Sequence, residues 1–332
     1  MIVLLKMPTD FDSYEIVSFI MAKKSVKERI ESMLKTPNSR EHDGLWTELA
    51  ELDELLEILA ATKHKDYRQR YACHTALTAL ARNTQSSEVV QAIIDVIGKT
   101  KTKQDKQGLL MGIQFLPPYE DAGPVLELIG DKKVGYTALR ALSTTTDERA
   151  EALVIEALVE GSFAFPAAET LAEIGTTAAV PALLTAIETG NGPLKRSALN
   201  ALRRIDGANH VELFADIYKT NRNADVRWHC VAALRDFGQK EHVGVVAERL
   251  TKIIKKKGRK ESYSGGPLIA PKNIVHISHT SQEDYATEFT LGVEFLQRIG
   301  GVEAEKFFKS LEKFKEQLLE SEREFLKERG LL

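Results

Sequence analysis

Cysteine is scarce in this sequence of 332 residues, which contains two, Cys73 and Cys230, far apart in the chain. Two thiols cannot form a zinc tetrad or a disulfide framework, so the composition favours a reducing compartment. Long apolar runs are also lacking, since no stretch approaches the roughly 18–20 apolar residues of a membrane-spanning helix. A net charge of −3 argues against coating nucleic acid by bulk charge, although a local basic surface is compatible with it. We therefore expect a cytoplasmic protein with no membrane-spanning segment.

Motifs that carry chemistry are missing as well. No His-Glu dipeptide occurs, which excludes the zincin pattern. His276 and His279 have no carboxylate or thiol in a metal-binding pattern beside them, and Ser264-Gly265-Gly266 is not followed by the Gly-Lys-Ser/Thr of a phosphate-binding loop. Cys73 and Cys230 each fall at a position where small buried residues are expected, so we interpret both as packing residues. We predict no catalytic residue, no metal site and no cofactor.

One recurring phrase dominates the sequence: a small residue, an aliphatic residue, two variable residues, and then Leu, Ile or Phe. The aliphatic residues of the successive phrases are Leu77, Ile113, Leu139, Leu171, Leu202, Leu234 and Leu296. They lie 36, 26, 32, 31, 32 and 62 positions apart, and the last interval equals two periods of 31. A sustained step of this length indicates a stacked repeat protein.

A second helical pattern precedes the phrase in each unit. Its apolar residues follow i, i+3, i+4, i+7 spacing, which places one apolar stripe on a helix; examples are Val89, Val90, Ile93, Ile94 and Ile97. Glycines follow Ile174, Phe237 and Ile299, where they suit a left-handed helix cap. The unit is therefore a helix, a short turn and a second helix. Because a single pair cannot cover its own apolar face, neighbouring pairs must stack.

These motifs resemble a known family. Asp225-Val226-Arg227, followed by Ala233-Leu234, Phe237 and Gly238, resembles the signature of HEAT-like repeats of the phycobilisome-lyase type. The stretch from Thr176 to Leu183 is similar to the inter-helix turn and first helix of that family. The resemblance covers roughly residues 50–255 and 284–300. It implies an all-α fold, namely a right-handed α-solenoid (an ARM/HEAT superhelix) of about seven helical hairpins with helical caps.

The pattern also predicts a domain organisation. Residues 1–52 are expected to form an N-terminal helical cap, residues 53–300 the repeat array, and residues 301–332 a charged capping helix. An irregular basic insertion interrupts the array at about 256–283. Long loops in compact proteins are usually functional or disordered, so we single out its Lys255, Lys256, Lys257 and Arg259 as candidate contacts.

The second helices are expected to line the concave face of the array, where equivalent positions form rows. Two rows, six residues before and one residue after the aliphatic position, share a helix face. They contribute the candidate partner-binding residues Lys133, Arg140, Phe165, Arg196, Arg203, Trp228 and Arg235. The competing interpretation is that these arginines pair with carboxylates of adjacent repeats. Lys195 and Arg227, one position away, are assigned to such a structural ladder.

Three functions are compatible with this surface. We predict a non-catalytic scaffold that binds a protein partner, expected to be an acidic segment, on the basic and aromatic groove. The alternative is nucleic-acid binding by the groove and the lysine-rich insertion, as in the DNA glycosylases that share this type of repeat. A weaker alternative is a chaperone that holds a chromophore, as implied by the resemblance to lyases. The oligomeric state and the identity of the partner do not follow from the sequence.

Overall fold

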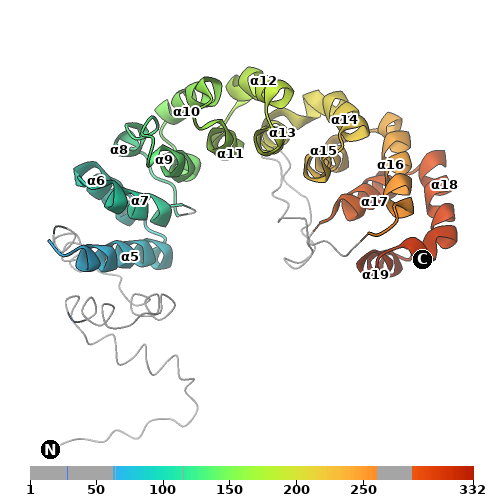
Figure 1. The fold of residues 1–332 in the computed structure, drawn as a ribbon, viewed down its shortest axis with the longest axis horizontal. Helices are drawn as coiled ribbons and strands as arrows, with labels where there is room; N and C mark the ends of the chain where they lie inside the picture. The colour runs from blue at the N-terminus through green and yellow to red at the C-terminus, as the bar shows by residue number, and fades with distance from the viewer. Residues whose placement is uncertain (1–27, 29–62, 64, 115, 260–285) are drawn as a thin grey trace, which may run out of the picture. The chain divides into compact units, whose positions relative to one another are not determined.

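The computed structural model describes residues 28, 63, 65–114, 116–259 and 286–332, which form an all-α structure (Figure 1). Apart from one isolated bridge between Tyr119 and Thr145, these residues contain no extended pairing. They fall into two compact units that meet in the sequence between Ile174 and Gly175. The predicted N-terminal cap and most of the predicted insertion lie outside the described residues.

The first unit contains helical hairpins in which a first helix is followed by the helix that carries the recurring phrase. Its α-helices are α5 (Tyr67–Thr84), α6 (Ser87–Lys99), α7 (Lys103–Gly112), α8 (Gly123–Leu126), α9 (Gly135–Ala141), α10 (Arg149–Glu160) and α11 (Ala164–Ile174), with a 3-10 turn at Leu142–Thr144. The phrase-bearing helices α5, α7, α9 and α11 pack against one another in sequence order, and α6 packs on α7 and α8.

In the second unit, first helices and phrase-bearing second helices alternate in the same way. Its α-helices are α12 (Val180–Thr189), α13 (Gly192–Asp206), α14 (Val211–Thr220), α15 (Ala224–Phe237), α16 (Val243–Lys255), α17 (Glu288–Ile299), α18 (Val302–Leu311) and α19 (Glu320–Glu328). Short 3-10 turns occur at Thr177–Ala179, Gly207–His210, Lys240–His242 and Glu312–Gln317. Helices α13, α15 and α17 pack in a row, and each contacts its hairpin partner α12, α14 or α16.

Polar side chains at the turns explain where several helices begin. The Ser86 and Thr102 hydroxyls accept backbone N–H groups at the starts of α6 and α7, and Asn191, Asn223 and Thr287 do the same for α13, α15 and α17. These caps satisfy donors that the first helical turn leaves unpaired. Helix boundaries are therefore determined locally.

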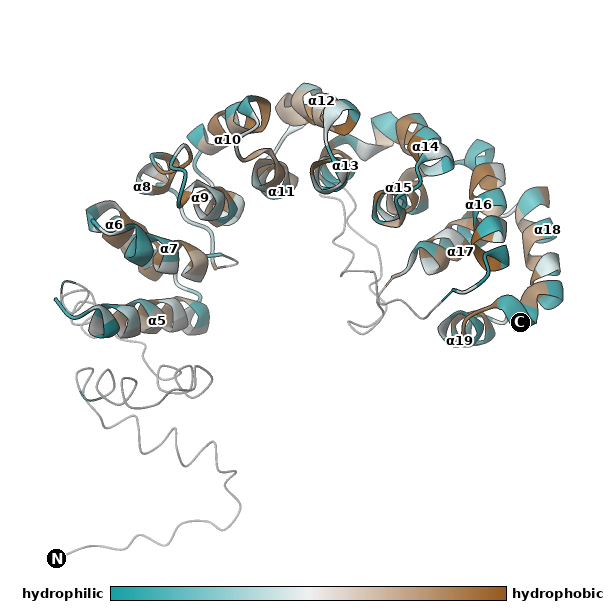
Figure 2. Ribbon diagram, viewed as in Figure 1, coloured by the Kyte–Doolittle hydropathy of each residue, from teal (hydrophilic) through white to brown (hydrophobic). Residues whose placement is uncertain are grey.

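The core runs between the two helices of each hairpin. All seven aliphatic phrase residues are fully buried, and each lies within a second helix or, for Ile113, directly after one. Apolar and polar residues alternate along the helices in Figure 2, as amphipathic packing requires. The prediction of an all-α solenoid of helical-hairpin repeats is confirmed.

The left-handed helix caps predicted at glycines are not found at Gly238 or Gly300. Gly300 has a positive φ of 70° but a ψ of −155°, outside the left-handed helical region, and Gly238 has φ −61° and ψ 149°. At Gly238 the constraint is space, because an added Cβ would lie 2.4 Å from the Leu234 carbonyl oxygen and 2.6 Å from the Phe295 ring. The close packing of α17 on the end of α15 therefore accounts for this glycine.

The expected C-terminal helix is broken into two. After α18 and a 3-10 turn, Leu318 is extended, with ψ 143°, and is buried. A new helix then starts, and the Glu322 carboxylate accepts the Leu319 N–H at 3.0 Å. Glu322 also pairs with Arg259, and both side chains are almost completely buried. This ion pair attaches α19 to the chain that follows α16, which a single straight helix would not allow.

Candidate functional site

Arg203 on α13 was predicted to be exposed, and this expectation is corrected by the structure. Its side chain is 1% exposed and its Nη1 lies 2.5 Å from Oδ2 of Asp236 on α15, whose side chain is 0% exposed. Burial lowers the pKa of Arg203, and Asp236 opposes this shift. Such a buried pair links adjacent repeats. Arg203 is therefore part of the core of the second unit and presents no charge at the surface.

Arg235, predicted in the same row, joins this network. Its guanidinium lies 2.7 Å from Asp236 and 3.5 Å from Glu294 on α17. Glu294 also pairs with Arg329 at 2.9 Å. Arg298 donates to the carbonyl oxygens of Leu234 and Gly238, at the C-terminal end of α15, where a cation is favourable. A continuous set of ion pairs and hydrogen bonds thus joins α13, α15, α17 and the C-terminal residues.

Two further arginines of the second unit are bound to carboxylates of the next repeat. Arg196, which is about one third exposed, pairs with Asp225 at 2.9 Å. Arg227 donates to both oxygens of Glu288 at 2.8 Å and to the Arg222 carbonyl oxygen. The assignment of Arg227 to a structural ladder is confirmed by this contact.

Trp228 has a partner of its own. Its indole N–H donates to the carbonyl oxygen of Ala286 at 2.6 Å, and its ring meets the edge of His229 at 4.8 Å between centroids. The side chain is half-buried. Arg196, Arg203, Arg235 and Trp228, the predicted contact residues of the second unit, therefore all make contacts that join adjacent repeats. Whether any of them also contacts a partner remains a prediction.

The first unit presents the other three predicted residues differently. Lys133 is exposed, and its side chain has no ion-pair partner among the described residues. Arg140 lies 3.9 Å from Glu169, and both side chains are more than one third exposed. Phe165 is half-buried, with its ring 6.4 Å from that of Tyr136. Lys133 is therefore accessible and Arg140 and Phe165 are partly accessible, whereas Arg203 of the second unit is excluded from solvent.

Other exposed apolar side chains lie on the second helices of the first unit. Tyr71 belongs to the first of the two predicted rows, whereas Tyr67, Met111 and Tyr136 fall outside both rows. Tyr67 and Tyr71 on α5 are 39% and 53% exposed, Met111 on α7 is 61% exposed, and Tyr136 on α9 is 40% exposed. When the helices are aligned at the recurring phrase, these residues and Phe165 span roughly 100° of arc. They therefore share one side of four helices that pack in order. The two predicted rows cover only part of this arc, and Tyr67, Met111 and Tyr136 therefore lie outside them.

We call this surface the basic–aromatic face. It comprises Tyr67, Tyr71, Met111, Lys132, Lys133, Tyr136 and Phe165. Lys132, like Lys133, is exposed and has no ion-pair partner among the described residues. Both lysines lie in the turn that leads into α9, four and three positions before Tyr136. Tyrosine and methionine are enriched at protein–protein interfaces, and the two lysines add local positive charge that attracts an acidic partner.

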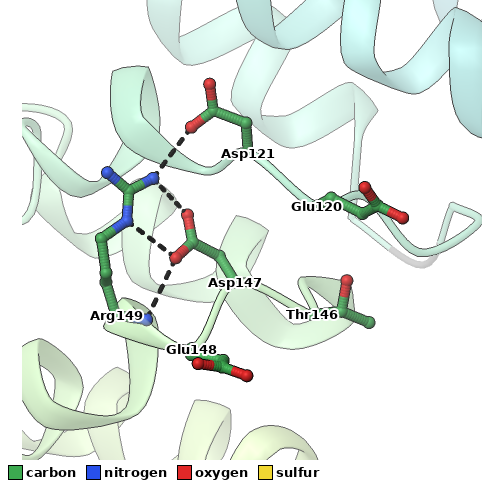
Figure 3. Close-up of a pocket in the computed structure, with 6 residues that line it drawn as sticks. All are labelled: Glu120, Asp121, Thr146, Asp147, Glu148 and Arg149. Carbon is green, nitrogen blue, oxygen red and sulfur yellow. Dashed lines mark hydrogen bonds and ion pairs between the residues drawn. The ribbon is translucent and has the colours of Figure 1, made fainter.

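A hollow on the first unit lies elsewhere, where α8 and α10 begin (Figure 3). Glu120, Asp121, Thr146, Asp147, Glu148 and Arg149 line it. The Arg149 guanidinium lies 2.5 Å from Asp147 and 2.9 Å from Asp121. Asp147 also accepts the N–H groups of Ala122 and Arg149. The hydrogen bond from Arg149 holds the pKa of Asp147 well below its usual range. These contacts connect two turns, and we assign the hollow a structural role.

Comparison with known proteins addresses the repeat itself. Residues 165–235, which include α11 to α15 in part, match the family described as HEAT repeats. A solved structure of an engineered protein is similar to 87% of this chain and 84% of that one, at 17% identity and a TM-score of 0.41. This similarity is too weak to support any further inference. No curated protein matches the sequence. The resemblance to phycobilisome lyases stays a prediction.

Charge is distributed unequally between the two kinds of helix in the first unit. The segments that contain the second helices, 65–84, 100–114, 130–145 and 161–174, carry ten basic and five acidic residues. The segments that contain the first helices, 85–99, 116–129 and 146–160, carry two basic and ten acidic residues. The basic–aromatic face therefore belongs to the basic side of the unit.

One group in the second unit has the spacing of metal ligands, namely Glu212, Glu241 and His242. His242 is buried, and its Nδ1 accepts the Gln239 N–H at 3.0 Å while its Nε2 lies 3.0 Å from Glu212. Because Nδ1 accepts a hydrogen bond, the proton of a neutral ring resides on Nε2 and points to Glu212. Neither ring nitrogen then offers a lone pair to a metal. We interpret the group as a helix cap.

The two cysteines of the array are fully buried, as expected for packing residues. Burial raises the pKa of Cys73 to about 11 and raises that of Cys230 further. Their thiols are therefore protonated at neutral pH and poorly nucleophilic.

The residues predicted in the insertion differ among themselves. Lys255, Lys256 and Lys257 are exposed, and the Lys255 ammonium lies 5.1 Å from the centre of the Phe314 ring. Arg259 is bound to Glu322, so its charge is neutralised within the fold. Residues 260–283 of the insertion lie outside the described residues. Among the described helices, none is long and apolar enough to cross a membrane.

Proposed function

We propose that this protein is a non-catalytic HEAT-repeat scaffold that binds an acidic segment of a protein partner on the basic–aromatic face of its first unit. The observation that carries the proposal is that Tyr67, Tyr71, Met111 and Tyr136 are exposed on consecutive second helices, with the half-buried Phe165 on the helix that follows. Large exposed apolar side chains on a monomer mark contact surfaces. Lys132 and Lys133 supply positive charge beside them.

The chemistry of the face specifies the partner. Tyrosine side chains contribute buried apolar area at a modest entropic cost, and the flexible methionine side chain adapts to the shape of a partner. Unpaired lysines accelerate the encounter with a negatively charged segment and disfavour basic competitors. An acidic segment with interspersed apolar side chains therefore fits better than a neutral or basic one.

In this proposal the predicted contact residues of the second unit stabilise the stacking of repeats and do not bind the partner. Arg196, Arg203 and Arg235 have carboxylate partners in adjacent repeats, so a partner would have to break existing ion pairs to reach them. The second unit is therefore proposed to be a rigid support. This assignment modifies the initial prediction, which spread the binding surface over all seven residues.

A labelled peptide provides the test. We expect a fluorescein-labelled peptide of alternating glutamate and leucine to bind the full-length protein, with affinity that falls as salt is raised. Lys132→Glu combined with Lys133→Glu should weaken binding by about tenfold or more. Tyr71→Ser combined with Met111→Ser should weaken it at all salt concentrations. The matched control, Lys256→Glu with Lys257→Glu, changes charge equally elsewhere and should have little effect. Equal binding by all variants would refute the proposal.

Nucleic acid is the second candidate partner, because exposed tyrosines next to lysines can stack bases of a single strand. The same variants tested with a labelled single-stranded oligonucleotide distinguish the two. Stronger binding of the oligonucleotide than of the peptide, lost in the Tyr71 and Lys132 variants, would replace the acidic protein segment by a nucleic acid.

A further inference from the structure

Helix α10 carries an acidic and apolar surface on the same unit. Val159 is 71% exposed and Leu153 is 38% exposed, although both belong to a helix whose other side is buried. Glu156 and Glu160 lie next to them, are exposed, and have no ion-pair partner among the described residues. On the helix these four residues span roughly 120° of arc, opposite the buried Ala150, Val154 and Ala157. We call them the α10 surface.

The α10 surface has the composition that the basic–aromatic face is proposed to bind. It offers two apolar anchors and two unpaired carboxylates, whereas the face offers tyrosines, a methionine and two unpaired lysines. The surrounding segments match in charge as well, since the first-helix segments are strongly acidic and the second-helix segments are basic. Charge and apolar character are therefore both complementary.

Within one molecule the α10 surface cannot contact the basic–aromatic face. Helix α10 packs on α11 through its buried side, so the α10 surface points away from the second helices of its own unit. The complementary pair can form only between two molecules. The contact uses different surfaces on the two copies and is heterologous, so it leaves a free face at one end and a free α10 surface at the other.

We infer that the α10 surface of one molecule docks on the basic–aromatic face of a second copy, so that self-association occludes the partner site. This inference rests on the proposed function of that face. The contact involves one helix on a few side chains, which corresponds to a small interface of low affinity. Self-association is then weak, depends on concentration and salt, and is displaced by an acidic partner.

Sedimentation velocity of the full-length protein tests the inference. We expect the weight-average sedimentation coefficient to rise with concentration at low salt and to fall when the Glu-Leu peptide is added. Glu156→Lys combined with Glu160→Lys should abolish the rise and leave peptide binding unchanged. The control, Glu188→Lys combined with Glu305→Lys, changes net charge equally at exposed positions of the second unit and should still self-associate.

A charge exchange gives a sharper readout. Neither the Glu156/Glu160 variant nor the Lys132→Glu/Lys133→Glu variant should self-associate alone, but an equimolar mixture should form a heterologous pair. A wild-type protein that stays monomeric at low salt, or self-association unaffected by the Glu156/Glu160 change, would overturn the inference and leave the proposed function standing if the peptide still binds. Failure of the wild-type protein to bind the peptide would instead remove the proposed function.

Discussion

Arg203 on α13 and Asp236 on α15 form an ion pair between two side chains that are both excluded from solvent. Asp236 also accepts a hydrogen bond from Arg235, which in turn reaches Glu294 on α17. Charge on the second helices of this unit therefore stabilises the stacking of three successive repeats.

Removal of one partner of this pair should be strongly destabilising. We expect Asp236→Ala to lower the free energy of unfolding by about 3–5 kcal/mol, because the buried Arg203 guanidinium loses the carboxylate that balances its charge. Arg203→Met combined with Asp236→Leu should cost much less. Denaturation by urea, followed by circular dichroism, measures both. Arg196→Ala provides the exposed control, with an expected loss below about 1 kcal/mol; equal losses for Asp236→Ala and Arg196→Ala would contradict the prediction.

Two histidines that are largely shielded from solvent, the buried His74 and the half-buried His229, predict the response to acid. Burial lowers the pKa of His74 to about 4 and that of His229 to about 3, and nearby Arg203 and Arg196 add to the shift at His229. The unfolded chain takes up these protons near pH 6.5 whereas the folded protein does not. The contribution of the two neutral rings to the free energy of unfolding is therefore fully present above pH 6.5. It decreases as pH falls toward 4 for His74 and toward 3 for His229, by up to ~1.4 kcal/mol per pH unit for each histidine.

Urea titrations at several pH values test this assignment. His229→Gln should flatten the slope of unfolding free energy between pH 6 and 4, irrespective of its effect at pH 7. His210→Gln, which replaces a half-buried histidine bound to Asp206, is the comparison. A slope that His229→Gln leaves unaltered would show that this ring is not responsible.

Two glycines of the second unit should respond in opposite ways to alanine. At Gly238 a methyl group would lie too close to Leu234 and Phe295, so Gly238→Ala should destabilise by about 1–3 kcal/mol. Gly244 lies inside α16 with open space around its Cβ position, so Gly244→Ala should stabilise by about 0.5–1 kcal/mol. Thermal unfolding of the two variants is sufficient, and melting shifts of the same sign would disprove the packing argument.

Asp147 should matter more than its neighbour Glu148, although both line the same hollow. Asp147 accepts two backbone N–H groups and the Arg149 side chain, whereas Glu148 is exposed. Asp147→Ala should therefore destabilise the first unit by about 1–3 kcal/mol, and Glu148→Ala by less than about 0.5 kcal/mol. Hydrogen exchange of the Ala122 and Arg149 amides is the specific measurement, because both should lose protection in Asp147→Ala alone.

The repeat could be predicted from sequence because it depends on local periodicity. Leu77 to Leu296 recur at a nearly constant step, and a buried stripe on each helix follows from that step without knowledge of neighbours. The same reasoning gave the position of Cys73 and Cys230 in the core. Helix caps such as Ser86 and Asn223 are equally local.

The surface could not be predicted to the same extent, because exposure depends on which side chain of the next repeat lies opposite. Arg140 and Arg203 occupy the same position in their phrases, yet Arg140 is more than one third exposed and Arg203 is buried against Asp236. Trp228 likewise finds its acceptor in Ala286, 58 positions away in the sequence. Neither pairing follows from spacing, because each depends on the separation and tilt of neighbouring helices.

The hydrogen bond of Trp228 provides an intrinsic optical probe. Indole emission shifts to longer wavelength when water replaces a protein acceptor, and only one other tryptophan, Trp46, occurs in the chain. In a Trp46→Phe background, fluorescence would therefore report directly whether the residues that lead into α17 remain attached to α15. A spectroscopic readout of the last repeat is thus available without any added label.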